Sequence, residues 1–404
     1  MTEFEKGYNI VFDTTSYNIY DYKIDGKQNC WLFIEKWLAV KKRGITMQLK
    51  PLQIGDLTIE YPIIQGGMGV GISRSSLAGA VSANGGLGII STAQIGYDEE
   101  DFDQNQEQAN LHAIGKHIKK AKEIAKGKPV GVNIMVATKD YPAYVKASAE
   151  AGADVIISGA GLPVRLPEYV EGFCCKIAPI VSSEKAAVLM LHNWEKKYHR
   201  TADFIVIEGP QAGGHLGFKE EQLSHITAKE YEEEIKKIIA VAQEYGQKFG
   251  QKIPVIVAGG IFDHGDICHA LSLGADGVQI ASRFVATKEC DADERYKQAY
   301  IEAKKEDIEI VMSPVGMPGR ALKNAFVRRI EKKPLPVSRC FNCLEKCNPA
   351  KVPYCITKAL INAVRGDIEN GLIFVGANVG RIRKMTNVHD LMAELTGERQ
   401  AAAH

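Results

Sequence analysis

Short apolar runs alternate with longer stretches of helical periodicity from residue 61 onward. The runs have the length and composition of buried parallel strands, and they occupy residues 62–65, 87–90, 130–134, 155–157, 177–181, 204–207, 255–257 and 277–280. Helix-like segments lie between most of them, most clearly at residues 107–126, 141–151, 184–198, 228–249 and 265–273. Eight such units close a barrel, so the pattern predicts an α/β fold, a TIM (β/α)8 barrel.

A doubly wound open sheet is the alternative to a barrel. That fold usually opens its first helix with Gly-x-Gly-x-x-Gly and places an acidic residue on the next strand. The glycine-rich residues 66–71 lack this spacing. The barrel is therefore the preferred interpretation.

The chain divides into three parts on composition. Residues 1–46 are rich in tyrosine and asparagine and form a leader, interpreted as a poorly ordered extension or a mis-assigned start. A small docking element is the alternative for the leader. Residues 47–300 are expected to form the barrel, and residues 301–404 a C-terminal extension.

Ligands of such barrels bind where the strands end, so those residues carry the candidate chemistry. They are small, polar or glycine, at residues 65–68, 91–92, 133, 158–159, 182–183, 209–215, 258–260 and 281–283. They include neither the carboxylate pair of a glycosidase nor several histidine or carboxylate ligands of a metallohydrolase. Small polar residues around the mouth suit a bulky planar cofactor that supplies its own reactivity.

His215 is the candidate catalytic residue. It follows the apolar run 204–207 and two glycines, Gly213 and Gly214, which permit a tight backbone beside a flat ligand. An imidazole can exchange a proton near neutral pH. A loop histidine bonded to a backbone carbonyl is the structural alternative, and the surrounding motif favours catalysis.

The predicted phosphate site follows the seventh and eighth apolar runs. Gly259 and Gly260 end the seventh run, and Ala281 and Ser282 follow the eighth. The loops after these two strands form the usual phosphate cradle of this fold. Two such ends on adjacent strands predict a phosphate-bearing ligand.

Five motifs together resemble the nitronate monooxygenase (2-nitropropane dioxygenase) family, which includes the flavin-dependent enoyl-acyl-carrier-protein reductases. They occur in the family's order at residues 62–68, 83–88, 208–215, 254–260 and 316–324. The resemblance covers roughly residues 47–330 and implies an FMN-binding barrel. By the same resemblance, the FMN contacts would be Gly67, Met68, Asn133, Gly214, Gly259, Gly260, Ala281 and Ser282, with His215 as the proton-transfer residue beside the flavin.

The resemblance implies an FMN-dependent oxidoreductase. The preferred interpretation is a nitronate monooxygenase, which oxidises alkyl nitronates with O2. An NAD(P)H-dependent enoyl-thioester reductase is the alternative, and a flavin-free barrel for a phosphate ligand is a second one. Ile180 is apolar, whereas some nitronate oxidisers resemble one another in carrying a lysine near this position. The residues of the substrate pocket therefore determine which of the two reactions the protein catalyses.

Four cysteines near the C-terminus form a C-x2-C-x3-C-x7-C series: Cys340, Cys343, Cys347 and Cys355. Thiolates this close in the chain can hold an iron–sulfur cluster or zinc, although the spacing matches no standard ferredoxin pattern. Free or redox-paired thiols stay open. After them, residues 356–364 predict a helix, and residues 371–380 predict either a segment returning to the mouth or a strand packed on the barrel.

Composition narrows the remaining classes. The chain has 404 residues, 45% hydrophobic and 25% charged, with a net charge of +1 and a pI of about 7.6. These values show no excess of positive charge that would indicate binding to nucleic acid or to an anionic membrane. No apolar run reaches the ~20 residues of a membrane span. The expected partner is a small-molecule substrate in the cytoplasm, and a homodimer stays open.

Overall fold

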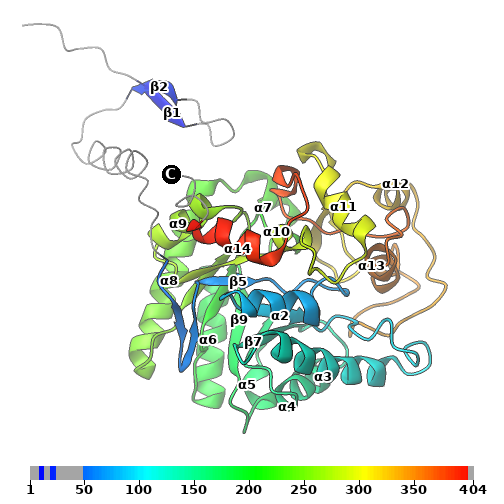
Figure 1. Cartoon of the computed structure of the whole chain (residues 1–404), viewed down its shortest axis with the longest axis horizontal. Coiled ribbons are helices and arrows are strands. Elements are labelled where there is room, and N and C mark those ends of the chain that lie inside the picture. Colours follow the sequence, from blue (N-terminus) through cyan, green and yellow to red (C-terminus); the bar gives the residue numbers. More distant parts are fainter. Residues whose placement is uncertain (1–8, 13–18, 24–48, 399–404) are drawn as a thin grey trace, which may run out of the picture. The chain divides into compact units, whose positions relative to one another are not determined.

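The computed structural model describes residues 9–12, 19–23 and 49–398. Residues 49–398 belong to one compact unit. Most of the predicted leader lies outside the described residues. Its described part is an antiparallel pair of strands, β1 (Asn9–Phe12) and β2 (Ile19–Lys23) (Figure 1).

Eight parallel strands form the barrel in the order in which they occur along the chain. They are β5 (Ile63–Gln65), β6 (Gly88–Ser91), β7 (Val130–Met135), β8 (Val155–Gly159), β9 (Lys176–Val181), β10 (Ile205–Glu208), β12 (Val255–Ala258) and β13 (Gly277–Ile280). The barrel closes between its first two strands, where the amide of Gln65 donates to the carbonyl of Leu87 at 2.9 Å. The predicted TIM barrel is confirmed, and each strand lies within two residues of its predicted apolar run.

The outer layer consists of helices between these strands. They are α2 (Ser75–Ala83), α3 (Gln106–Ile124), α4 (Tyr141–Glu150), α5 (Leu166–Tyr169), α6 (Glu184–Tyr198), α7 (Glu220–His225), α8 (Ala228–Phe249) and α9 (His264–Ser272). The longest, α8, starts at a capping box between Thr227 and Glu230 and ends at Gly250 with a φ of +65°. These local signals explain why the helix bounds could be predicted closely.

A short hairpin seals one end of the barrel. Strands β3 (Leu52–Ile54) and β4 (Leu57–Ile59) bury their apolar side chains among the inward-facing residues of the barrel strands. Asp56 in its turn pairs with Lys176, the first residue of β9. The hairpin therefore plugs the amino ends of the strands, and only the carboxyl ends remain for a ligand.

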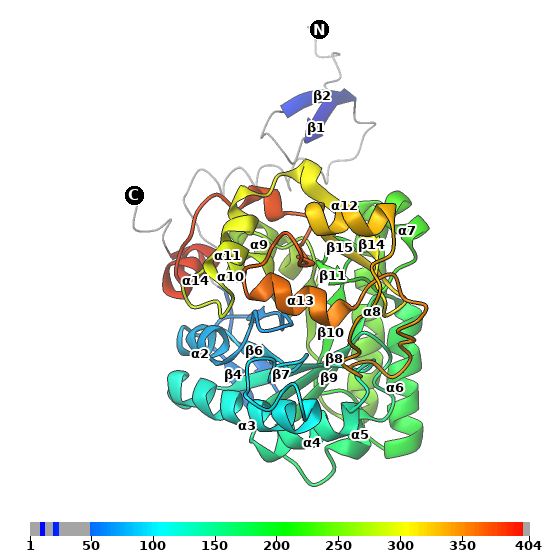
Figure 2. The same cartoon turned by 90° about the vertical axis from the view of Figure 1, so that its right-hand side faces the viewer.

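The chain after β13 builds over the open end and then returns to the outer layer. Its elements are α10 (Ser282–Val285), α11 (Glu294–Glu302), η1 (Lys305–Asp307), β14 (Ile308–Met312), β15 (Pro318–Leu322), α12 (Ala325–Lys332), α13 (Ile356–Val364), η2 (Val379–Arg381) and α14 (Val388–Thr396). Strands β14 and β15 join β11 (Gly214–His215) in a small antiparallel sheet. Figure 2 shows this sheet and α13 together over one end of the barrel.

Helix α14 takes the outer place that follows the last barrel strand. Its side chains Val388, Leu391, Met392 and Leu395 are buried in the main core, against α2 and α9. The end of the chain thus completes the ring of helices around the barrel. No helix within the described residues is long and apolar enough to cross a membrane.

Candidate active site

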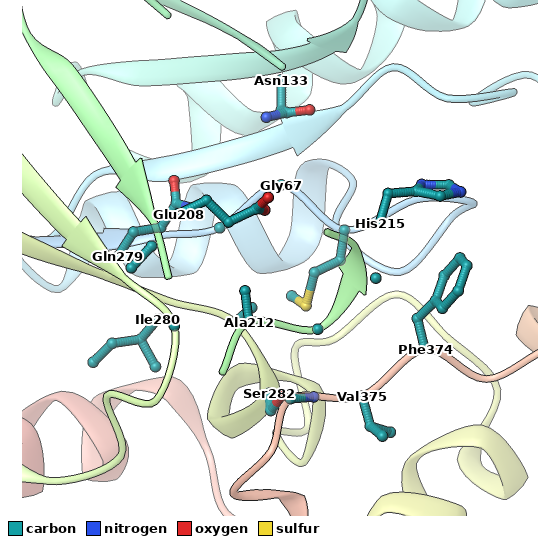
Figure 3. A pocket seen from close by; sticks show the side chains of 18 of the residues that line it. Gly67, Asn133, Glu208, Ala212, His215, Gln279, Ile280, Ser282, Phe374 and Val375 are labelled. Atoms are coloured by element: carbon teal, nitrogen blue, oxygen red, sulfur yellow. The ribbon is translucent and has the colours of Figure 1, made fainter. Parts of the chain in front are cut away.

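A cavity of about 240 Å³ lies at the carboxyl ends of the barrel strands (Figure 3). All nine residues that the sequence indicates for catalysis and cofactor contact line it: Gly67, Met68, Asn133, Gly214, His215, Gly259, Gly260, Ala281 and Ser282. They come from five loops or strands spread over more than 200 residues. The structure therefore brings the whole predicted set around one space.

Glycines keep the floor and one side of this cavity open. A Cβ on Gly67 would lie 2.4 Å from the Cβ of Asn133, so only glycine fits there without displacing the asparagine. Gly259 and Gly260 have φ values of +92° and +87°, which side-chain-bearing residues rarely adopt. These positions let a ligand approach the backbone closely.

His215 is held by contacts on two sides. Its Nε2 atom lies 2.7 Å from the hydroxyl of Ser313, and its ring meets the ring of Phe374 edge-on at 5.0 Å. Nδ1 makes no hydrogen bond to any residue in the described ranges, so it is free for a ligand. Burial lowers the pKa of His215 to about 4, and the imidazole is therefore neutral at physiological pH.

Two further polar side chains in the cavity were not assigned a role from the sequence. Glu208 ends β10 and is half-buried, and its desolvation raises the pKa of its carboxyl to about 8 although the amide of Gly217 opposes the shift. Gln279, on β13, has a buried Oε1 atom without a hydrogen-bond partner among the described residues. Figure 3 shows both side chains near Gly67. The neutral carboxyl of Glu208 can donate a hydrogen bond, and the amide oxygen of Gln279 can accept one, so both side chains can bind a polar ligand.

Residues 374–378 form a segment that closes the side of the cavity opposite Asn133. The amide of Gly376 donates to Ser282 Oγ at 3.0 Å, and the side chain of Asn378 donates to the carbonyl of Gly260 at 2.7 Å. Phe374 also forms an isolated antiparallel bridge with Ala321 of β15. The predicted return of residues 371–380 to the mouth is confirmed, whereas the alternative of a strand is limited to this one bridge, because the segment ends in a turn and η2.

Apolar side chains form the wall beyond His215. They are Ile72, Met135, Ile180, Met317, Leu360 and Phe374. The cation that lines the cavity, Arg283, is already engaged by Glu394 at 2.9 Å and by the carbonyl of Phe262 at 2.8 Å. A substrate on this side would be bound mainly through apolar contacts.

The four cysteines of the C-terminal series line a second, separate cavity of about 30 Å³. Within residues 49–398, no three histidine, cysteine or carboxylate side chains are close enough to hold one metal ion together. Cys340, Cys343, Cys347 and Cys355 therefore do not form the predicted shell of a single ion such as zinc. The four residues instead share the lining of one small cavity.

Comparisons with known proteins agree on the family. A probable nitronate monooxygenase of Staphylococcus saprophyticus is 25% identical over 308 residues, which cover 71% of this chain and 82% of the relative. A (3aS,4S,5R,7aS)-5-hydroxy-7a-methyl-1-oxo-octahydro-1H-indene-4-carboxyl-CoA dehydrogenase of Mycobacterium tuberculosis is 26% identical over 273 residues, 68% of this chain and 66% of the relative. Both are distant, so neither fixes the substrate.

Solved structures share the fold. FabK from Thermotoga maritima is 28% identical with a TM-score of 0.65, and the match covers 85% of this chain and 95% of FabK. Nitroalkane oxidase from Streptomyces ansochromogenes is 20% identical with a TM-score of 0.62, over 85% of this chain and 97% of the oxidase. The family model of nitronate monooxygenase matches residues 50–398. The chain therefore belongs to the nitronate monooxygenase family of oxidoreductases.

Proposed function

We propose that this protein is an FMN-dependent oxidoreductase that oxidises alkyl nitronates with O2. The observation that carries the proposal is a neutral imidazole, His215, with a free Nδ1 in a cavity whose wall is apolar. A neutral imidazole can accept a proton from the α-carbon of a neutral nitroalkane, which converts the nitroalkane into the nitronate that is oxidised. The family match supports an oxidoreductase of this kind.

The cavity fits FMN on two independent observations. The buried Oε1 of Gln279 needs a donor, and the flavin ring carries an N–H group that can supply it. Gly67, Gly259 and Gly260 line the cavity without side chains, so a planar ring and a phosphate could lie directly against their backbone. When bound, FMN would supply the electron transfer between substrate and oxygen.

The chain's own residues would then divide the remaining work. Asn133 and Gln279 would orient the ring, and the backbone at Gly260 and Ser282 would receive the phosphate. His215 would take the proton at Nδ1 while Ser313 holds Nε2. The apolar wall around Phe374 would exclude water from the reacting carbon.

An NAD(P)H-dependent enoyl-thioester reductase is the second candidate. Similarity to FabK from Thermotoga maritima and to a CoA-thioester dehydrogenase favours it, as does the apolar Ile180 in the cavity wall. In that reaction His215 would have to donate a proton. With a pKa of about 4, only roughly a thousandth of the imidazole is protonated at pH 7.

One pair of assays separates the two enzymes. The purified protein is expected to be yellow and to release FMN on denaturation, which a flavin-free barrel would not do. It should consume O2 with an alkyl nitronate or propionate 3-nitronate and produce nitrite. Anaerobic oxidation of NADH or NADPH with crotonyl thioester, without turnover of nitronates, would show that the reductase reading is right.

The pH dependence tests the role of His215. With a neutral nitroalkane as substrate, kcat/KM is expected to be constant from about pH 5 upward and to fall as the pH drops through about 4. The sign follows because burial lowers the pKa, so the proton-accepting form persists until acid protonates it. A rate that rises as the pH falls through neutrality would instead indicate proton donation by His215.

A further inference from the structure

The cysteine cavity is a separate site that the proposed reaction does not use. Cys340, Cys343, Cys347 and Cys355 all line it, and no histidine or carboxylate joins them. The four positions span two segments, a loop and the residue before α13. Four thiols around one space of this kind, in a chain with no disulfide among its described residues, require an explanation.

The arrangement of the sulfurs decides what could fill the cavity. A single zinc ion needs its thiolates at about 2.3 Å, so the four sulfurs must converge on one point. They do not converge closely enough here for one ion. An iron–sulfur cluster places its iron and sulfide atoms between the cysteines, so the ligands stand farther apart around a central space.

The surroundings of the cavity suit such a group. Its other lining residues are mainly apolar, with Val337, Phe341, Leu344 and Ile356 among them. The amide of Asn342 donates to Cys340 Sγ at 3.3 Å, and Asn342 adopts a φ of +48° to do so. Amide hydrogen bonds to sulfur are among the features that stabilise clusters and set their potentials, and the exposed Cys340 leaves this site partly open to solvent.

The loop that carries three of the cysteines is tied to the barrel. The amide of Lys139 donates to the carbonyl of Cys343 at 3.2 Å, and that of Glu345 donates to Ala137 at 3.1 Å. Arg339 pairs with Asp103 at 2.8 Å. The loop is thus fixed against the segments that follow β6 and β7.

Two segments connect the cysteine loop with the wall of the main cavity, the chain that follows β7 and helix α13. Met135 lines the main cavity two residues before Ala137. Cys355 precedes α13, and Leu360 of that helix also lines the main cavity. Five residues of helix span about 7.5 Å, so the two cavities are neighbours.

We propose that Cys340, Cys343, Cys347 and Cys355 hold an iron–sulfur cluster beside the main cavity. The site itself follows from the four cysteines that line one cavity. Its role rests on the reductase candidate: the cluster would take single electrons from a one-electron donor protein and pass them to the bound cofactor, two for each enoyl group reduced. Nitronate oxidation takes its electrons from the substrate and needs no such route.

The test is metal and sulfide analysis of the full chain purified without oxygen. Equal amounts of iron and acid-labile sulfide are expected, at least about two of each per chain. The Cys343→Ser variant should lose both, whereas Cys174→Ser, which changes an exposed cysteine outside the cavity, should keep both. Zinc without sulfide, or neither iron nor zinc, would overturn the proposal.

A second measurement does not depend on a variant that folds. Anaerobic dithionite reduction of the wild-type chain should produce a low-temperature electron paramagnetic resonance signal of a reduced cluster, beyond any flavin signal. Iron and sulfide in a protein without nitronate or enoyl turnover would support the site while removing the proposed function. Turnover of a nitronate or an enoyl thioester by a protein without iron and sulfide would support the proposed function and overturn the cluster site.

Discussion

The His215→Gln variant is expected to lose about 10²–10⁴-fold in kcat while it keeps its full content of FMN. Glutamine can still reach Ser313 with its amide, but it cannot accept a proton at neutral pH. The imidazole touches no part of the predicted phosphate cradle at Gly259 and Gly260. Turnover of a nitroalkane and the flavin absorbance of the same preparation measure the two effects separately.

Two further variants test whether the loss of kcat is specific to the base His215. His225→Gln changes an exposed histidine of α7 outside the cavity, so its kcat should equal that of the wild type. Ser313→Ala removes the 2.7 Å contact to Nε2 but leaves the base, so we expect a smaller loss than in His215→Gln. Activity of His215→Gln close to that of the wild type would remove His215 from the proposed mechanism.

The barrel could be predicted from the sequence because its signals are local. Apolar runs such as residues 277–280 are bounded by turn residues, and helices such as α6 and α8 begin at a capping residue. Connecting eight similar units in order leaves few alternatives to a closed barrel. The site residues followed because the fold fixes where strand ends meet.

What the sequence could not indicate depends on contacts between distant segments. Ser313 reaches His215 from 98 residues away, and Phe374 comes from farther still. Ser313 belongs to no motif, and for Phe374 the sequence indicated only that residues 371–380 return to the mouth, without a contact to His215. The lowered pKa of His215 and the raised pKa of Glu208 both arise from burial, which only the assembled cavity reveals.

The cysteine series also shows what spacing along the chain leaves undetermined. Their spacing left an iron–sulfur cluster, zinc and free thiols open. The structure narrows these three possibilities, because the four cysteines line one cavity yet do not form a group that could hold a single metal ion. Spacing along a chain gives the number of ligands, and the fold gives the size of what they can surround.

The Gly260→Asp variant is expected to be purified without flavin. A carboxylate would stand beside the predicted phosphate position, and two unit charges about 4 Å apart repel by about 4 kcal/mol near a protein surface. That energy corresponds to roughly 10³-fold weaker binding of FMN. The new Cβ would also lie 2.3 Å from Gln211 Oε1 in a backbone with a φ of +87°, which adds strain.

Two control variants separate charge from backbone strain. Gly172→Asp places the same side chain at an exposed glycine with a φ of +83° and no neighbour within 4 Å, so it should lower the melting temperature only slightly and keep its flavin. Gly260→Ala shares the crowding at Gln211 without the charge, so its affinity for FMN should lie between those of Gly260→Asp and the wild type. Flavin absorbance after gel filtration and a fluorescence titration with FMN give these affinities. A Gly260→Asp protein that retains a full equivalent of FMN would place the phosphate away from the loops that follow β12 and β13, because a buried carboxylate and a phosphate cannot share that space.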